Sequence, residues 1–148
     1  MKTILLPDGV VAPLRATSKK QVLQELSRKA ASLLDIAEHD IFEALLERER
    51  LGSTGIGKGV AIPHCRLESL RKVSGIFAHV DPAVDFDAVD GQPVDLVFLL
   101  LAPSSAGADH LRALATISRL LRDDSTCHKL RGSSTADALR AILLQGDE

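Results

Sequence analysis

The stretch from Arg48 to His64 reads R-E-R-L-G-S-T-G-I-G-K-G-V-A-I-P-H and is the most informative part of this sequence. Glycine lets a backbone come close to a ligand, and the N–H groups of such loops commonly bind phosphate. Pro63 restricts the backbone on both of its sides, so His64 is presented from a stiff segment. The pattern predicts that His64 handles a phosphoryl group. The loop residues expected to bind that group are Ser53, Thr54, Gly55 and Gly57.

The same glycines also fit two other interpretations. Gly52 to Lys58 satisfies G-x-x-x-x-G-K, the pattern of a nucleotide-binding P-loop. The next residue is Gly59, however, so the Ser or Thr that holds Mg²⁺ is missing. A P-loop also follows a strand and opens a helix, whereas this loop follows a predicted helix. The pattern therefore disfavours a nucleotide site, while a purely structural glycine turn stays open as an alternative.

Length and composition indicate a single globular domain covering residues 1–148. Hydrophobic residues make up 45% and charged residues 26%, which is ordinary for a globular protein. No run of about 18 apolar residues occurs, and the apolar stretch at the N-terminus is too short for a signal peptide. We therefore expect a cytoplasmic protein without membrane insertion. A net charge of −2, with no basic block and no Trp or Tyr, argues against a nucleic-acid partner.

Hydrophobic spacing and capping residues predict five helices. Ser18 followed by Gln21 is a capping box, and apolar residues at helical spacing come after it. Asp40 and Glu43 form a second box, before a helix that ends at Leu51 ahead of a glycine. The remaining predicted helices cover residues 108–122, 126–130 and 135–144.

Strands are expected between these helices. The segment Val94–Leu101 is so continuously apolar that both of its faces should be buried. A second strand is predicted at Val73–Val80, and a short one at Val60–Ile62. Val10 and Val11, which follow the turn signal Pro7-Asp8-Gly9, predict a short edge strand. The order of elements favours one α/β domain whose central sheet is covered by helices.

Two further side chains are candidates for contacting a phosphoryl group. His110 lies in the first turn of the third predicted helix, on a face shared with Leu114 and Ile117. It is therefore either a core histidine or a site residue at the end of the helix. Arg48 lies on the apolar side of the second helix; such an arginine usually extends into water, but its forked guanidinium also suits phosphate oxygens. The other histidines, which are not closely spaced and predict no metal site, are His39, His79 and His128.

Histidine chemistry explains why His64 suits a phosphoryl group. A neutral imidazole has a free lone pair, and a pKa of about 6.5 keeps histidine mostly neutral at cellular pH. A phosphohistidine formed this way needs no metal or cofactor, but it does need donors aimed at the phosphoryl oxygens. We expect one ring nitrogen of His64 to face solvent and the other to be held by a backbone acceptor. Because a donor protein must reach the ring, we also expect a shallow depression with an apolar rim.

A family resemblance extends this interpretation. The segment G-S-T-G-I-G-K-G-V-A-I-P-H resembles the active-site segment of the enzyme IIA proteins of the fructose–mannitol class in the phosphoenolpyruvate-dependent phosphotransferase system, and looks most like their nitrogen-regulatory branch. The likeness continues through F-D-A-V-D-G-Q-P-V-D-L-V-F-L-L-L-A-P and H-L-R-A-L-A-T-I-S-R-L-L-R-D. It implies a mixed sheet sandwiched between helices. It also implies that His64 is phosphorylated at its tele nitrogen and that His110 and Arg48 contact the phosphoryl group.

The resemblance also implies partners. An HPr-type phosphocarrier protein would donate the phosphoryl group. Nitrogen-branch proteins mostly regulate partner proteins by their phosphorylation state, whereas sugar-branch proteins pass the group to an enzyme IIB. A sugar-transport enzyme IIA therefore stays open as an alternative, as does a binding module in which His64 is never modified.

One residue departs from the family pattern. The family usually has Gly after the active histidine, where this sequence has Cys65. A side chain at that point would narrow the site or demand a different backbone angle. A thiol beside a phosphohistidine also raises redox sensitivity as an alternative to a passive replacement.

Overall fold

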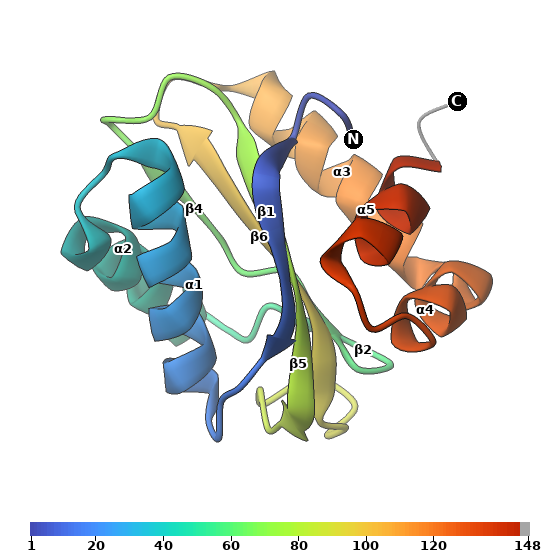
Figure 1. The fold of residues 1–148 in the computed structure, drawn as a ribbon. Coiled ribbons are helices and arrows are strands. Elements are labelled where there is room, and N and C mark those ends of the chain that lie inside the picture. Colours follow the sequence, from blue (N-terminus) through green and yellow to red (C-terminus); the bar gives the residue numbers. More distant parts are fainter. Residues whose placement is uncertain (146–148) are drawn as a thin grey trace.

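The computed structural model of the chain describes residues 1–145 (Figure 1). In that range a mixed six-stranded sheet is covered by helices on both faces, as the fold class predicted. The helices are α1 (Lys19–Leu34), α2 (Glu38–Arg50), α3 (Ala108–Arg122), α4 (Asp124–Arg131) and α5 (Ala136–Gln145). The strands are β1 (Leu5–Leu14), β2 (Gly55–Gly57), β3 (Val60–Ala61), β4 (His64–Leu67), β5 (Ser74–Val84) and β6 (Val94–Pro103).

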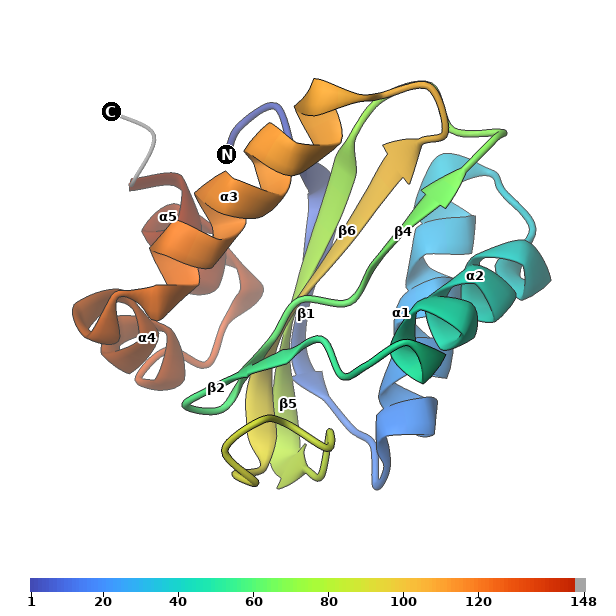
Figure 2. The ribbon, with the colours of Figure 1, turned by 180° about the vertical axis from the view of Figure 1, so that it is seen from behind.

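The sheet runs in the order β1-β5-β6-β3-β2, and β4 also pairs with β6. Strands β5 and β6 are antiparallel, whereas β1 is parallel to β5, and β3 and β4 are parallel to β6. Helices α1 and α2 cover one face of the sheet, and α3, α4 and α5 cover the other (Figures 1 and 2). Each face therefore has its own hydrophobic core.

Strand β6 lies in the middle of the sheet and separates the two cores. Val97 and Leu99 belong to the core under α1 and α2, whereas Leu96 and Phe98 belong to the core under α3, α4 and α5. All four side chains are fully buried. The expectation that both faces of this strand are covered is confirmed, and it explains why the strand is so continuously apolar.

The helix boundaries test the predicted capping residues. Ser18 accepts a hydrogen bond from the backbone of Gln21 at 3.1 Å, and the Gln21 side chain accepts one from the backbone of Thr17 at 2.7 Å, so the start of α1 is confirmed. Helix α2 begins at Glu38 without a side-chain cap, so the second predicted capping box is wrong. Asp40 already lies in the first turn, where the helix dipole favours a carboxylate. Among the helices of residues 1–145, none is long and apolar enough to cross a membrane.

The later helices follow the predictions closely. Helix α3 covers the predicted range 108–122. Helix α4 begins at Asp124, two residues earlier than predicted, because the side chain of Asp123 caps it by accepting from the backbone of Thr126 at 3.0 Å. The tail therefore contains a capping residue that the sequence pattern had not identified.

Strand β1 differs most from its prediction. A short edge strand was expected at residues 10–11, but β1 spans ten residues along the edge of the sheet. Its pairing with β5 contains a register shift between Leu5 and Val10. The segment Pro7-Asp8-Gly9 is therefore an irregularity inside an edge strand and not a turn before it. Proline is tolerated there because an edge strand pairs on one side only.

Two short strands, β2 and β4, have no counterpart in the predictions. Strand β2 pairs with β3 in the antiparallel direction, within the glycine-rich segment. Strand β4 begins at His64 and pairs with the last part of β6, after β3 has paired with an earlier part. The candidate histidine therefore stands on the sheet itself and not on a loop.

The close approach of Gly75 in β5 to Phe98 in β6 makes a first prediction. A Cβ atom at Gly75 would lie 2.4 Å from Cε1 and 2.8 Å from Cζ of Phe98, whose ring is fully buried. We expect Gly75→Ala to lower the free energy of unfolding by about 1–3 kcal/mol through overpacking. Urea denaturation measures this change.

Gly132→Ala is the matched control. A Cβ atom there would meet only backbone oxygens at 3.5 and 3.6 Å, which is ordinary contact. Its effect on the free energy of unfolding is expected to stay within about 0.5 kcal/mol. Equal stability of the two variants would contradict the packing argument.

Candidate functional site

His64 is positioned by the sheet. It pairs with Leu100 of β6, and the Pro63 carbonyl accepts from the Leu100 backbone at 2.9 Å. The ring Nδ1 of His64 lies 2.8 Å from the carbonyl oxygen of Ile62. Because a carbonyl can only accept, Nδ1 carries the hydrogen and Nε2 keeps a lone pair. The backbone acceptor expected for one ring nitrogen is thus the Ile62 carbonyl.

Arg48 reaches His64 from the last turn of α2. Its Nε atom donates to Nε2 of His64 at 3.3 Å, and its Nη1 atom donates to the carbonyl of Gly52 at 2.8 Å. These two bonds direct the guanidinium toward the glycine-rich segment instead of outward into water. Arg48 therefore donates to the unprotonated ring nitrogen of His64, the one that carries the lone pair.

His110 lies next to His64 although the two are far apart in the sequence. The centroids of the two rings are 5.7 Å apart, and the ring planes make an angle of 47°. His110 is buried in the first turn of α3, and its Nδ1 atom has no hydrogen-bond partner among the described residues. This leaves Nε2 as the ring nitrogen that a ligand can reach. The structure thus places His110 at the end of the helix, beside the other candidate histidine.

The three side chains open onto a shallow depression of about 500 Å³. Arg66 and Leu51 also line it, and Leu51 is 85% exposed. A larger hollow of about 670 Å³ lies beside the N-terminus and contains neither histidine. The chemistry of the lining, and not the size of the hollow, therefore identifies the candidate site.

Both histidines are held in their neutral form. Burial lowers the pKa of His64, the hydrogen bond to Ile62 raises it, the charge of Arg48 lowers it and the charge of Glu49 raises it, with a net lowering. Burial also lowers the pKa of His110, with smaller contributions from His64 and Arg66. A neutral His64 keeps the lone pair on Nε2 that a nucleophile needs.

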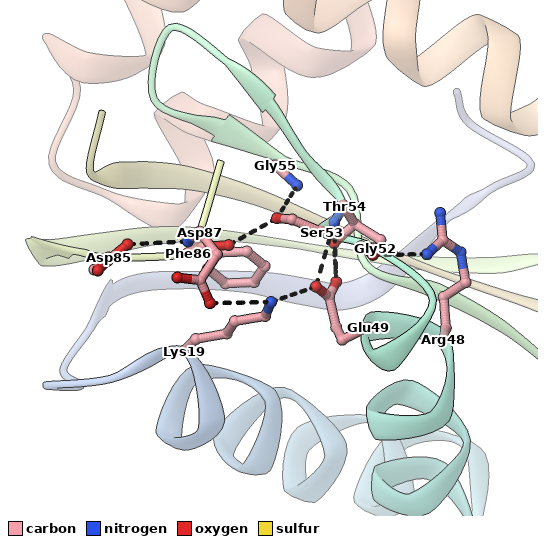
Figure 3. A network of polar contacts seen from close by, with 10 residues as sticks. All are labelled: Lys19, Arg48, Glu49, Gly52, Ser53, Thr54, Gly55, Asp85, Phe86 and Asp87. Carbon is pink, nitrogen blue, oxygen red and sulfur yellow. Dashed lines mark hydrogen bonds and ion pairs between the residues drawn. The ribbon is translucent and has the colours of Figure 1, made fainter. Parts of the chain in front are cut away.

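The glycine-rich segment uses its polar groups to hold itself in place (Figure 3). The Ser53 hydroxyl donates to the carbonyl of Phe86 at 2.7 Å and accepts from the backbone of Gly55 at 3.0 Å. Both the backbone N–H and the hydroxyl of Thr54 donate to the carboxylate of Glu49. None of the four loop residues expected to bind phosphate lines the depression. These residues are Ser53, Thr54, Gly55 and Gly57. Their contact with a phosphoryl group stays a prediction.

Two residues near the site were not found by sequence reasoning. Arg66 lies two residues after His64 in β4, and side chains two apart in a strand share a face. That signal depends on recognising β4, which is too short to show a clear pattern. Glu49 binds Thr54 behind the depression, and in the sequence it is only one of several acidic residues of α2.

The remaining histidines take no part in this arrangement. His39, His79 and His128 do not line the depression. Within residues 1–145, no group of three or more His, Cys, Asp or Glu side chains is placed to hold a metal ion.

Cys65, which stands where the family usually has Gly, fits without an unusual backbone angle. It is not among the described residues with positive φ, and its side chain is buried in the core under α1 and α2. Burial raises the pKa of its thiol to about 12. The thiolate is the reactive form of cysteine, so this environment favours a passive replacement over a redox-sensitive one.

The raised pKa of Cys65 leads to a second prediction. At pH 8 a shift from about 9 to about 12 lowers the thiolate fraction roughly a thousandfold. We expect Cys65 to resist iodoacetamide in the folded protein and to react readily in urea, with mass spectrometry identifying the labelled residue. Rapid labelling of folded Cys65 at pH 8 would show that the thiol is accessible and that this interpretation is wrong.

A family assignment agrees with this fold and site. The family described as "Phosphoenolpyruvate-dependent sugar phosphotransferase system, EIIA 2" matches residues 3–146. The chain belongs to this family.

Its relatives include proteins named for nitrogen regulation. A nitrogen regulatory protein of Bradyrhizobium diazoefficiens is 54% identical over 140 residues, covering 95% of this chain and 92% of that protein. One from Pseudomonas aeruginosa is 41% identical over 145 residues, covering 97% and 94%. The crystal structure of nitrogen regulatory protein IIA-Ntr from Neisseria meningitidis has a TM-score of 0.89 and 38% identity, covering 95% of this chain and 96% of that chain. These similarities support the nitrogen-regulatory branch.

Proposed function

We propose that this chain is a phosphocarrier of the nitrogen-regulatory type, which accepts a phosphoryl group on Nε2 of His64 and regulates partner proteins by its phosphorylation state. The arrangement of His64 carries the proposal: Nδ1 is bound to Ile62, while Nε2 lies beside Arg48 at an open depression. The 54% identity to a nitrogen regulatory protein favours the regulatory role over sugar transport.

The proposed transfer follows from the ring geometry. The lone pair on Nε2 of His64 attacks phosphorus while the P–N bond to the donor's imidazole breaks, and the electrons of that bond return to the donor nitrogen. The hydrogen stays on Nδ1, where the Ile62 carbonyl stabilises the positive charge that develops on the ring. The step uses no metal or cofactor.

Two neighbouring side chains would stabilise the phosphoryl oxygens. The Nε–H of Arg48 donates to Nε2 of His64 before transfer, and the same N–H is available to an oxygen once Nε2 is bonded to phosphorus. We assign the hydrogen of His110 to Nε2, the ring nitrogen that a ligand can reach, so that its N–H supplies a second donor, while Nδ1 is buried without a partner in the described part of the chain. Donors aimed at developing charge are a major source of rate enhancement in such sites.

The rim of the depression suits a protein donor. Leu51 at the end of α2 is 85% exposed, and Leu111 in α3, next to His110, is 63% exposed. The charged side chains of the lining are those of Arg48, Arg66 and Glu47, so positive charge predominates. We therefore assign the donor as an HPr-type protein that presents its phosphohistidine, itself anionic, within an apolar patch. With such a donor we propose that the protein acts in the cytoplasm.

Removal of His64 is the direct test. Incubated with phosphoenolpyruvate, enzyme I and an HPr-type protein, the wild type should acquire an acid-labile phosphoryl group. His64→Ala should acquire none, whereas His128→Ala, a change at an exposed histidine on α4, should match the wild type. Undiminished labelling of His64→Ala would remove the basis of the proposal. A subsequent incubation with candidate enzyme IIB domains, if it discharged the label, would favour the sugar-transport alternative.

Replacement of His110 tests the second donor. His110→Ala should slow phosphoryl transfer by about 10²–10³-fold, the usual effect of removing one transition-state donor, and should leave His64 as the labelled residue. Rapid-quench measurement of the transfer rate from the phosphorylated donor checks this, with circular dichroism to confirm folding. A folded variant with an unchanged rate would mean that His110 is only a packing residue.

A further inference from the structure

Behind the depression, Glu49 is a buried carboxylate that the proposed transfer does not use. Its side chain is 6% exposed and lies 2.6 Å from the ammonium group of Lys19. The backbone nitrogen of Thr54 lies 3.3 Å from each carboxylate oxygen, and the Thr54 hydroxyl also donates to Oε1 (Figure 3). One carboxylate therefore joins the start of α1, the end of α2 and the glycine-rich segment.

Besides its ion pair with Glu49, Lys19 also contacts the segment 85–87. Its ammonium group lies 5.2 Å from the centre of the Phe86 ring and 3.9 Å from the carboxylate of Asp87. Phe86 in turn accepts the hydrogen bond from Ser53 through its carbonyl. The segment 85–87 thus contacts both Lys19 and the glycine-rich segment, the two partners of Glu49 (Figure 3).

A chain of hydrogen bonds runs from Glu49 to the ring of His64. The carbonyl of Thr54 accepts from the backbone nitrogen of Ile62 at 3.0 Å. The carbonyl of Ile62 accepts from Nδ1 of His64 at 2.8 Å. Glu49 therefore contacts Thr54, and Thr54 contacts Ile62. The Ile62 carbonyl, together with the Nε–H of Arg48 that donates to Nε2, favours the form of His64 with its hydrogen on Nδ1.

Glu49 is also coupled to Arg48, its neighbour in the chain. Arg48 donates to the carbonyl of Gly52, and Glu49 accepts from the backbone of Thr54. The last turn of α2 therefore makes hydrogen bonds to the glycine-rich segment at two points. The two side chains act on His64 in opposite directions, because the charge of Arg48 lowers the pKa of His64 and the charge of Glu49 raises it. A displacement of the last turn of α2 would therefore change the effects of both Arg48 and Glu49 on the His64 ring.

Stability alone does not account for a buried ion pair at this point. Taking two charges out of water is costly, and apolar side chains of similar volume often stabilise a protein as well or better. An apolar pair, however, offers no acceptor for the N–H and hydroxyl of Thr54. Only a carboxylate or an amide can accept the hydrogen bonds from Thr54, and these bonds are the first in the series that reaches His64.

We propose that Glu49, held by Lys19, is a positioning residue that acts through Thr54 and Ile62 to keep the hydrogen of His64 on Nδ1 and the lone pair on Nε2. Its effect on phosphoryl transfer rests on the function proposed above. Its effect on the tautomer of His64 does not, because the tautomer is a property of the unphosphorylated protein.

Nitrogen-15 NMR of the histidine rings across a pH titration tests this proposal. The wild type should show His64 in the Nδ1–H form. Glu49→Ala should shift His64 toward a mixture of tautomers, because the Ile62 carbonyl loses the support that Glu49 gives it through Thr54. The variant should also lower the pKa of His64, because the negative charge of Glu49 is lost. Glu49→Gln keeps an acceptor for Thr54, so it should retain the tautomer and lower the pKa alone.

Phosphoryl transfer supplies the second measurement. The initial rate should fall by at least about tenfold in Glu49→Ala and by less in Glu49→Gln, since small misplacements of reacting groups carry penalties of that size. Glu43→Gln, which removes the same charge from an exposed position of α2, should match the wild type in both measurements. If Glu49→Ala does not fold, Thr54→Val, which removes one donor and keeps the ion pair, takes its place and should shift the tautomer in the same direction.

The outcomes separate the two proposals. A folded Glu49→Ala or Thr54→Val with the tautomer of the wild type would overturn the positioning role, even if the wild type is phosphorylated normally. A wild type that is never phosphorylated, but whose tautomer depends on Glu49, would overturn the phosphocarrier function and leave the positioning role standing.

Discussion

The arrangement of this molecule depends on the burial of strand β6 on both of its faces. Because β6 is covered on both sides, its two edges must be paired, with β5 on one edge and β3 and β4 on the other. The parallel pairing of β4 places His64 opposite Leu100, close to the end of β6 at Pro103. The chain then turns directly into α3, which starts at residue 108. His110 consequently lies beside His64 although the two are 46 positions apart in the sequence.

The site combines neutral rings with permanent positive charge. Burial holds the pKa of both histidines low, which preserves a lone pair on one and keeps the pair from repelling each other. Arg48 and Arg66 line the depression and supply attraction for an anionic group. A site built this way separates the nucleophile from the groups that neutralise charge, and it does so without a metal in the proposed step.

Much of this could be predicted from the sequence where the signal was strong and local. The long apolar run of β6 and the helical spacing of α1 and α3 identified those elements. The glycine-rich motif and the family resemblance pointed to His64, His110 and Arg48, which line one depression in the structure, while their roles stay a prediction. The short strands β2 and β4 could not be predicted for two different reasons. Strand β4 is defined by its pairing with the distant strand β6. Strand β2 pairs with the neighbouring β3, but its three residues, two of them glycine, carry no strand pattern of their own.

The glycine-rich segment shows a different limit of sequence reasoning. Glycine and small hydroxyl residues suggest groups that face a ligand, yet the donors of Ser53 and Thr54 are used by Phe86 and Glu49. Nothing in the motif distinguishes a donor aimed at a ligand from one aimed at a buried carboxylate. That distinction requires the position of Glu49, whose side chain reaches the segment from the preceding helix.

The contact between the two ends of the described chain has a consequence for biosynthesis. Arg140 in α5 donates to the carbonyl of Leu6 in β1 at 2.8 Å, and Leu139 and Leu143 share a core with Leu5. When the ribosome has made only β1, two of its partners are still missing: strand β5, which pairs with it, and helix α5, which packs against it. Contacts between such distant segments form slowly and only after both have been made. Until α5 has been made, the nascent chain thus exposes the apolar face of the sheet that α5 covers, and this face is a surface that chaperones can protect.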